Sequence, residues 1–485
     1  MRHQRYLCLG YLCNLFFNLC NPCSAAFTGM SWLDNGVVRV GVDLDLGGAI
    51  THVSRSGDPV NLVNSHDWGR QIQMSHYSGP VPFTVPGKAP NPAWAGLGWN
   101  PIQSGDCFGH RSRTTAHRND GKTMTTACIP MQWPLDGVPG DCTFETRITL
   151  AGDVIRVAAK VKNRRADRTW YDARHQELPA LYTVGTHHRL MTYAGDRPFT
   201  DGELTEIVKT PEEVAATNGF PWKAWLATEN WAALVNDANQ GLGIRHAGVV
   251  HFLGGFHGQR GTGGPKDGPT GYIAPIHNEI FDPDIEYEYA YELIVGSLDV
   301  IRKRVYALGR PPAAPAWRFQ KDRQHWTYHD ATDAGWPIRG RLDVKPTGPN
   351  PQVIGPDAFW RAEDGPVLAI EAAATGMNPQ GRVYWKRLDA HGFAAERSLP
   401  FEFLADGKFR TIKVRLADSP EYRGGITGLR IDPVPERGGD FVAPALGTGR
   451  APSGDGGDSV APAGGTGQAP PRESGIQVKS IRLEK

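Results

Sequence analysis

Two acidic side chains, Asp106 and Glu177, stand in local sequences that favour acid–base chemistry. Asp106 follows a glycine in a predicted turn, and Glu177 comes shortly before Pro179, which restricts the backbone at a predicted strand end. Cleavage of a glycosidic bond uses two carboxyl groups, one that protonates the leaving oxygen and one that activates water or attacks. Because an Arg-His-Gln run precedes Glu177 and can shift its pKa, we assign Glu177 as the acid and Asp106 as the base. The structural alternative is that Asp106 caps its turn and Glu177 pairs with Arg174 on the surface.

Four segments rich in aromatic and hydrogen-bonding side chains supply candidate substrate contacts. They are residues 64–80, 98–110, 174–188 and 268–279. An aromatic face can stack on a sugar ring while amide, guanidinium and imidazole groups bind its hydroxyls, so converging segments would form a sugar-binding cleft. The expected contacts are Trp68, Arg70, His76, Tyr77, Trp99, Asn100, Gln103, His110, Arg174, Gln176, His188 and Tyr272. For residues 98–110 the alternative is a buried turn whose polar groups cap backbone amides.

Several familiar catalytic and binding motifs are missing from the sequence. There is no G-x-S-x-G or H-E-x-x-H motif, and the glycine-rich run 254–271 lacks the G-K-[ST] ending of a phosphate-binding loop. Residues 43–48 lack the further acidic ligands of a calcium loop. The histidine pairs 187/188 and 251/257 do not have a spacing that directs both side chains to one ion. We therefore expect no cofactor and no metal.

Charge and composition narrow the class of partner. The formal net charge is +1, and the lysines and arginines form no basic stripe, so we expect no nucleic-acid partner. The sequence has 58 Gly, 38 Pro, 14 Trp and 14 Tyr, a composition typical of loop-rich β proteins with few long helices.

Residues 1–26 are predicted to be a signal peptide. Arg2 and Arg5 precede an apolar run that ends near Leu19, and Ser24-Ala25-Ala26 offers small residues for cleavage. This run is short for a membrane span, and no later segment is apolar enough. We therefore expect a secreted or periplasmic protein without a membrane span.

Cleavage after the signal peptide would leave Cys107, Cys128 and Cys142 in an oxidising compartment. Cys128 and Cys142 bracket a turn rich in proline and glycine between two strand-like runs, so the favoured disulfide joins these two. The alternative is that all three cysteines are buried thiols.

Alternating apolar residues predict many strands. Residues 38–46 alternate strictly before a Gly47-Gly48 turn, and residues 285–294 place three tyrosines on one face and three glutamates on the other. Two short helices are expected, one capped by Thr210 and one starting at Ser297. This pattern predicts an all-β protein: a large antiparallel β-sandwich (supersandwich) followed by a smaller β-sandwich or jelly-roll domain.

The predicted domain boundaries follow composition. The large sandwich should span 27–309, a proline-rich linker 310–340, and a second β domain 341–485. Within that domain, residues from about 436 to 475 are too rich in Gly, Pro and Ser to bury a core, so a disordered insertion is expected there. The strand after it should return to the sheet.

The opening strand pair GVVRVGVDLDLGGAITHVS, continuing into GDPVNLVN, resembles the start of galactose-mutarotase-like β-sandwich proteins. The resemblance extends over residues 30–310, and the tail resembles the jelly-roll carbohydrate-binding modules often attached to such sandwiches. It implies a carbohydrate-active protein. No His or Glu of this sequence can be assigned to the mutarotase catalytic pair, which argues against a simple epimerase.

Three functions remain open at this stage. The first is a secreted glycoside hydrolase acting on a polysaccharide or oligosaccharide. The second is a polysaccharide lyase, in which Arg70 or Arg174 would neutralise a uronate and His76 or Tyr77 would move the proton. The third is a non-catalytic glycan-binding protein.

Overall fold

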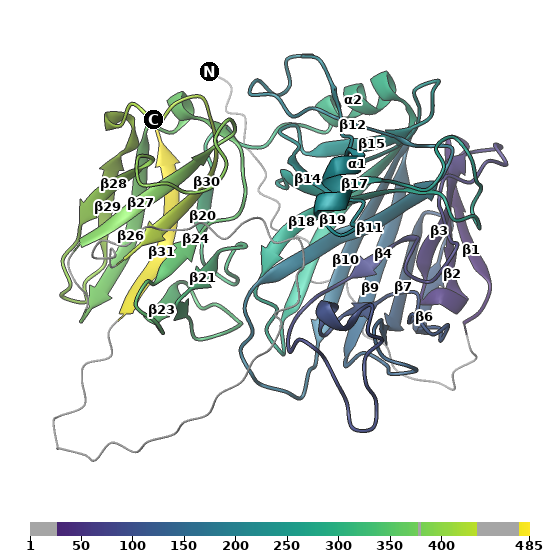
Figure 1. Ribbon diagram of the computed structural model, residues 1–485, viewed down its shortest axis with the longest axis horizontal. Helices are drawn as coiled ribbons and strands as arrows, with labels where there is room; N and C mark the ends of the chain where they lie inside the picture. Colours follow the sequence, from purple (N-terminus) through teal and green to yellow (C-terminus); the bar gives the residue numbers. More distant parts are fainter. Residues whose placement is uncertain (1–26, 377–379, 434–474) are drawn as a thin grey trace.

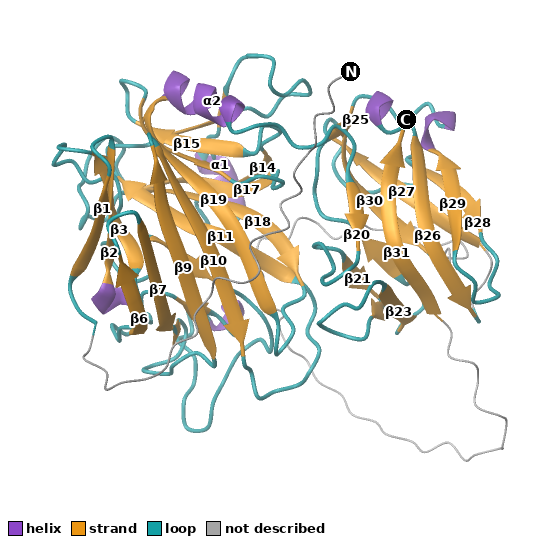
Figure 2. Ribbon diagram, turned by 180° about the vertical axis from the view of Figure 1, so that it is seen from behind, coloured by secondary structure: helices purple, strands orange, loops and turns teal. Residues whose placement is uncertain are grey.

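The computed structural model describes residues 27–376, 380–433 and 475–485. Two antiparallel β-sandwiches lie side by side in Figure 1, and Figure 2 shows the same division from behind. The larger sandwich ends with the helix α2 (Leu298–Ala307), and the smaller one begins at the strand β20 (Ala316–Arg318). The predicted all-β class, with a large sandwich followed by a smaller one, is confirmed.

The large sandwich consists of sheets that we call I and II. Sheet I has the order β1 (Met30–Asp34), β2 (Val38–Asp43), β3 (Ala49–Arg55), β4 (Ile72–Ser75), β11 (Arg174–Val184), β18 (Thr270–Glu279), β17 (His251–His257) and β14 (Lys223–Leu226), with β5 (Pro101–Ile102) joining β4 to β8 (Met131–Gln132). Sheet II has the order β13 (Thr205–Glu206), β12 (Arg189–Thr192), β15 (Trp231–Val235), β16 (Gln240–Arg245), β19 (Glu286–Ser297), β10 (Val154–Asn163), β9 (Cys142–Ala151), β7 (Thr123–Ile129) and β6 (Arg113–Asn119).

The small sandwich consists of sheets III and IV. Sheet III has the order β22 (Ala331–Thr332), β23 (Leu342–Pro346), β31 (Gly475–Glu484), β26 (Val367–Thr375) and β29 (Arg410–Arg415), with β20 paired to β31. Sheet IV has the order β21 (Thr327–His329), β24 (Gln352–Ile354), β30 (Gly425–Asp432), β27 (Gln380–Arg387) and β28 (Ser398–Glu402), with β25 (Trp360–Arg361) paired to β30. The return of the last strand to the sheet is confirmed, because β31 pairs with both β23 and β26.

The opening strand pair forms β2 and β3, but β2 ends earlier than the alternation predicts. Residues 44–46 form a short 3-10 helix, because the Asp43 side chain accepts a hydrogen bond from the Asp45 N–H at 3.0 Å. Leu44 and Leu46 remain buried in this conformation. Gly47 follows with a φ of 61°, and a Cβ at this position would lie 2.3 Å from the Gln103 carbonyl oxygen. Only glycine fits both requirements.

The tyrosines of β19 lie on one face, as predicted. Tyr287, Tyr289 and Tyr291 are buried in the core between sheets I and II, while Glu288 on the opposite face is exposed. The two predicted helices are also present. α1 (Pro211–Ala216) has a capping box built by Thr210, and α2 is capped by Ser297.

The expected linker 310–340 differs from the structure. From residue 316 onward it belongs to the small sandwich, because β20 pairs with β31 and the aromatic residues Trp317, Phe319 and Trp326 are buried in that core. These aromatic side chains remove enough apolar surface from water to outweigh the extended preference of the prolines before them. The predicted signal peptide and the body of the predicted insertion lie outside the described residues.

The favoured disulfide is also corrected by the structure, in which Cys107, Cys128 and Cys142 are free thiols. In the pairing of β7 with β9, Cys128 lies opposite Phe144, two residues beyond Cys142. Diagonal neighbours of this kind are about 7–8 Å apart, whereas disulfides need Cα atoms within about 6.8 Å. No helix among the described residues is long and apolar enough to cross a membrane.

Candidate functional site

Glu177 lies on β11, on the face of sheet I that is turned away from sheet II, which we call the outer face. Ala180, Tyr272 and Ile276 form a separate apolar cluster on this face, whereas Leu178 and Leu181 belong to the core between the sheets. The register of β11 shifts between Glu177 and Leu181. This irregularity brings Glu177 to the same face as Ala180 and Tyr182, which follow the shift, although strict alternation would separate them.

Two tyrosine hydroxyls donate hydrogen bonds to the Glu177 carboxylate. Tyr77 binds Oε2 at 2.9 Å, and Tyr272 binds Oε1. The Ser75 hydroxyl donates to the Tyr77 oxygen at 3.0 Å and so fixes the orientation of that phenol. Each carboxylate oxygen has two lone pairs, so each can still accept or share a proton with a substrate. Three residues predicted from separate sequence segments therefore meet in one site.

An aromatic platform adjoins this carboxylate. The Tyr272 ring centroid lies 4.7 Å from that of Tyr182 and 4.8 Å from that of Trp222, with the rings tilted at 35° and 45°. Tyr182 and Trp222 are partly exposed, whereas Tyr272 is buried beneath them. We call Tyr182, Trp222 and Tyr272 the aromatic platform. Partly exposed aromatic faces beside a hydrogen-bonding group are suited to stacking on the apolar face of a sugar ring.

The loop between residues 67 and 70 places a charged pair near the platform. The Arg70 Nε lies 3.1 Å from an Asp67 carboxylate oxygen, and Arg70 also donates to the Gly268 carbonyl at 2.5 Å. The charges of Asp67 and Arg70 both influence the pKa of the Tyr182 phenol, which places this pair within electrostatic reach of the platform.

Burial controls the ionisation of the site. Removal from water raises the pKa of Glu177 above its ordinary value of 4.5, and the hydrogen bonds from Tyr272, Ser75 and Tyr77 oppose part of that rise. Burial and the nearby Glu177 charge raise the pKa of Tyr77 and Tyr272 well above 10.0. The phenols therefore remain protonated at neutral pH, and Glu177 is the group of the three that can exchange a proton.

Asp106 is placed differently from Glu177. Its side chain is fully buried, and its carboxylate accepts hydrogen bonds from the backbone N–H groups of Phe108, His110 and Gly137 at 2.8–3.0 Å. The His110 ring also lies 2.9 Å from it through Nδ1. These contacts are those of a turn cap, which is the structural alternative stated for this residue.

Several predicted contact residues lie inside the protein. His76, Trp99 and Asn100 each have 0% exposure, and Gln103 and Gln176 are also buried. The Trp99 indole donates to the Asp141 carboxylate at 2.8 Å, and His76 stacks on Phe281 and binds Gln176 at 3.1 Å. Gln103 binds backbone groups of Met74 and Gly47. Residues 98–106 thus form a buried loop that supports β4 and β11 from the core side.

The remaining predicted contact residues have other neighbours. Arg174 donates to the backbone carbonyls of Ser78, Gly96 and Leu97, and not to Glu177, because residues three apart on a strand point to opposite faces. His188 pairs with Asp237 at 3.3 Å, and the Arg111 guanidinium lies 5.5 Å from the Trp68 ring centroid.

The site residues assigned from the sequence did not include Tyr182 and Trp222 of the platform or Asp67, whose charge acts on Tyr182. Tyr182 and Asp67 stand inside segments that were singled out, but only the folded chain shows that the charges of Glu177 and Asp67 both act on the Tyr182 phenol. Trp222 lies next to β14, outside all four segments, and nothing in its neighbourhood marks it in the sequence. No group of three or more His, Cys, Asp or Glu able to hold a metal occurs among the residues that the structure describes.

Comparisons with known proteins find similar solved structures but assign no role to the residues of this site. No protein-family model matches the chain, and no curated protein matches it. Similar solved structures include a galactose mutarotase related enzyme from Lactobacillus acidophilus, at 12% identity and a TM-score of 0.33, covering 56% of this chain and 98% of that one. A galactose mutarotase-like protein from Lactobacillus casei has 13% identity and a TM-score of 0.33, covering 55% and 100%. A 4-alpha-glucanotransferase from Thermococcus litoralis has 10% identity and a TM-score of 0.30, covering 55% and 37%.

Proposed function

We propose that this protein is a carbohydrate-active enzyme, a secreted or periplasmic glycoside hydrolase that acts on a polysaccharide or oligosaccharide. The observation that carries the proposal is the carboxyl group of Glu177, a partly exposed residue, whose pKa burial raises and which binds Tyr272 of the aromatic platform. A general acid must hold its proton near the working pH, and burial is a common way to achieve this.

The substrate would lie over the platform with a glycosidic oxygen near Glu177. Trp222 and Tyr182 would stack against one or two sugar rings, which fixes their position before reaction. Tyr77 and Tyr272 would hold the Glu177 carboxyl in one orientation, and their hydroxyls would stabilise the carboxylate that remains once the proton has left.

We assign Asp67 as the second carboxylate in preference to Asp106. The Asp67 side chain is 46% exposed and lies in the loop beside the platform, whereas that of Asp106 is 0% exposed and occupied by backbone donors. The Arg70 Nε lies 3.1 Å from an Asp67 carboxylate oxygen, and a carboxylate in this position could activate the water that attacks the glycosidic carbon.

The test is incubation of the protein with a panel of neutral and acidic polysaccharides, followed by analysis of the products. New reducing ends without new ultraviolet absorbance would support a hydrolase. Products that absorb as unsaturated uronates would show that the protein is a lyase and would refute the hydrolase assignment. Affinity for a glycan without any product would show that the protein is a binding protein. The absence of both affinity and product across the whole panel would refute a carbohydrate function for the site.

A further inference from the structure

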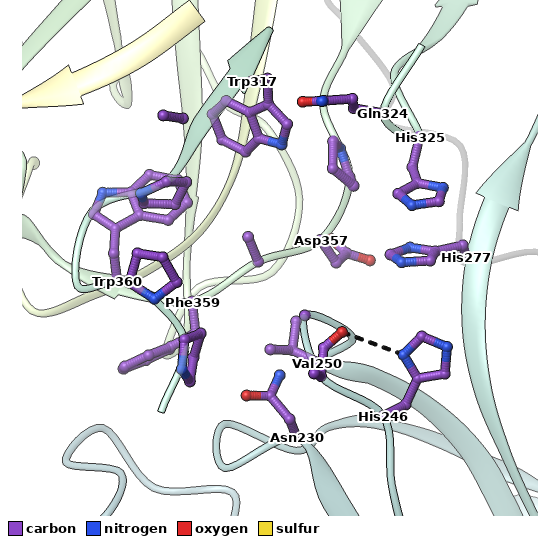
Figure 3. A pocket seen from close by; sticks show the side chains of 18 of the residues that line it. Asn230, His246, Val250, His277, Trp317, Gln324, His325, Asp357, Phe359 and Trp360 are labelled. Atoms are coloured by element: carbon purple, nitrogen blue, oxygen red, sulfur yellow. Dashed lines mark hydrogen bonds between the residues drawn. The ribbon is translucent and has the colours of Figure 1, made fainter. Parts of the chain in front are cut away.

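A cavity of about 1270 Å³ lies between the two sandwiches, and Glu177 is not among the residues that line it. Its walls come from β18, β19 and neighbouring loops of the large sandwich and from residues 310–364 of the small one. Figure 3 shows His246, His277 and His325 on one side and Phe359 and Trp360 on the other. The cavity therefore exists only when both sandwiches are in place.

Polar contacts between the sandwiches hold its walls. Arg323 of the small sandwich is buried and binds Asp282 of the large one at 2.5 Å. His325 lies 2.8 Å from Glu279, and Arg361 lies 2.6 Å from Asp196. Because several separate pairs join the two units around the cavity, its shape is set before any ligand arrives.

Neutral hydrogen-bonding groups on four residues that line this cavity are buried and have no partner among the described residues. They are His246 Nε2, Asn230 Oδ1 and the hydroxyls of Tyr287 and Tyr289. All four side chains are more than nine-tenths buried. A buried polar atom without a partner costs free energy, so a native site of this kind is normally completed by a ligand or by water.

The chemical form of these groups defines what they can bind. Burial lowers the pKa of His246 to about 4, so its ring is neutral near pH 7. Its Nδ1 can only donate to the Ala247 carbonyl, 3.4 Å away, which leaves Nε2 as an acceptor. The Asn230 amide nitrogen donates to the Val249 carbonyl at 2.7 Å, which leaves Oδ1 as a second acceptor. Two acceptors beside two phenols match a ligand with several hydroxyl groups.

The two carboxylates beside the histidines of the cavity, Asp357 and Glu279, are already paired. Asp357 binds Lys386 and lies 3.3 Å from His251, and Glu279 pairs with His325. Trp336 and Phe359, both partly exposed, add aromatic surface. A neutral ligand with apolar ring faces fits this wall better than an ion does.

We propose that the cavity between the sandwiches is a second glycan-binding site, one that takes a neutral oligosaccharide and performs no chemistry on it. Hydroxyls of the sugar would donate to His246 and Asn230 and accept from Tyr287 and Tyr289. The volume exceeds the range of about 300–1,000 Å³ that is typical of small-molecule pockets, so it has room for more than one sugar ring. This inference goes beyond the proposed hydrolase chemistry, since neither Glu177 nor any residue of the aromatic platform lines the cavity.

The test uses the full chain carrying Glu177→Gln, with cellohexaose, maltohexaose and a galacturonate hexamer as probes in titration calorimetry. We expect saturable binding of at least one neutral hexasaccharide and weaker binding of the uronate. Adding Tyr287→Phe and Tyr289→Phe together should weaken that binding by about tenfold or more. These substitutions remove only unpartnered hydroxyls, so the melting temperature should not fall.

The matched control is Tyr291→Phe, the next tyrosine on the same face of β19, which does not line the cavity. It should leave the affinity unchanged within about twofold. Absence of saturable binding, tighter binding of the uronate, or equal affinity with and without the Tyr287 and Tyr289 hydroxyls would overturn the inference. Binding that depends on these hydroxyls, in a wild-type chain that cleaves no glycan, would uphold the inference and refute the proposed hydrolase.

Discussion

Replacing Tyr272 with phenylalanine should raise the pKa of Glu177. The Tyr272 hydroxyl donates to the Glu177 carboxylate and stabilises its charged form, so its loss favours the protonated form. A hydrogen bond to a charged group contributes about 1.5–3 kcal/mol, which corresponds to about one to two pKa units at 1.36 kcal/mol per unit. Because Glu177 is partly exposed, water will replace some of the lost bond, and we expect a rise of about one unit.

Infrared difference spectroscopy across a pH titration measures this directly, with the spectrum of Glu177→Gln subtracted to isolate one carboxyl group. Tyr182→Phe is the matched control, since it alters the same platform without removing a hydroxyl that binds Glu177. If turnover depends on protonated Glu177, the alkaline limb of the profile of turnover against pH should move to higher pH in Tyr272→Phe. An unchanged or lowered Glu177 pKa in this variant would refute the reasoning.

Three further predictions concern residues outside the platform. Trp99→Ala should reduce the free energy of unfolding by about 3–5 kcal/mol in denaturant titrations, because a large buried side chain is lost; near-wild-type stability with weakened glycan binding would instead show that Trp99 contacts sugar. Asp106→Asn should cost about 1–3 kcal/mol, since an amide cannot accept from every donor now bound, while turnover of an identified substrate stays near normal; loss of turnover by orders of magnitude at unchanged stability would restore Asp106 as a catalytic base. Burial lowers the pKa of His76 to about 3 and that of His187 and His246 to about 4, so only the unfolded chain binds these protons as pH falls below about 6.5. Stability should therefore be retained above pH 6.5 and decline between about pH 6.5 and 4 in melting experiments, and a melting temperature that is constant over this range would contradict the burial argument.

Local patterns were sufficient to predict most of the architecture. The structure contains the alternating strands β2 and β19 and the helix caps at Thr210 and Ser297. These features depend only on residues that are close in sequence. The sequence analysis placed the start of the small sandwich too late, because the prolines before Trp317 suggest a linker. The burial of Trp317 depends instead on pairing with β31, a strand from the far end of the chain.

The site was only partly predictable for the same reason. Glu177, Tyr77 and Tyr272 were named from composition, yet their hydrogen bonds depend on the pairing of β11 with β18 and on the irregular register of β11. Trp99 and Asn100 carry side chains suited to a sugar, but the same side chains also satisfy a buried loop. Sequence composition does not distinguish these cases, because both use aromatic rings and amides at turns.

The most direct test of the central claim compares Glu177→Gln with wild type on a glycan that the wild-type protein cleaves. The exposed Glu203→Gln serves as the control for loss of a glutamate charge. The account predicts that turnover falls by orders of magnitude in Glu177→Gln while affinity for the glycan is retained, and that Glu203→Gln matches wild type in both. Near-normal turnover in Glu177→Gln would contradict the assignment of Glu177 as the acid.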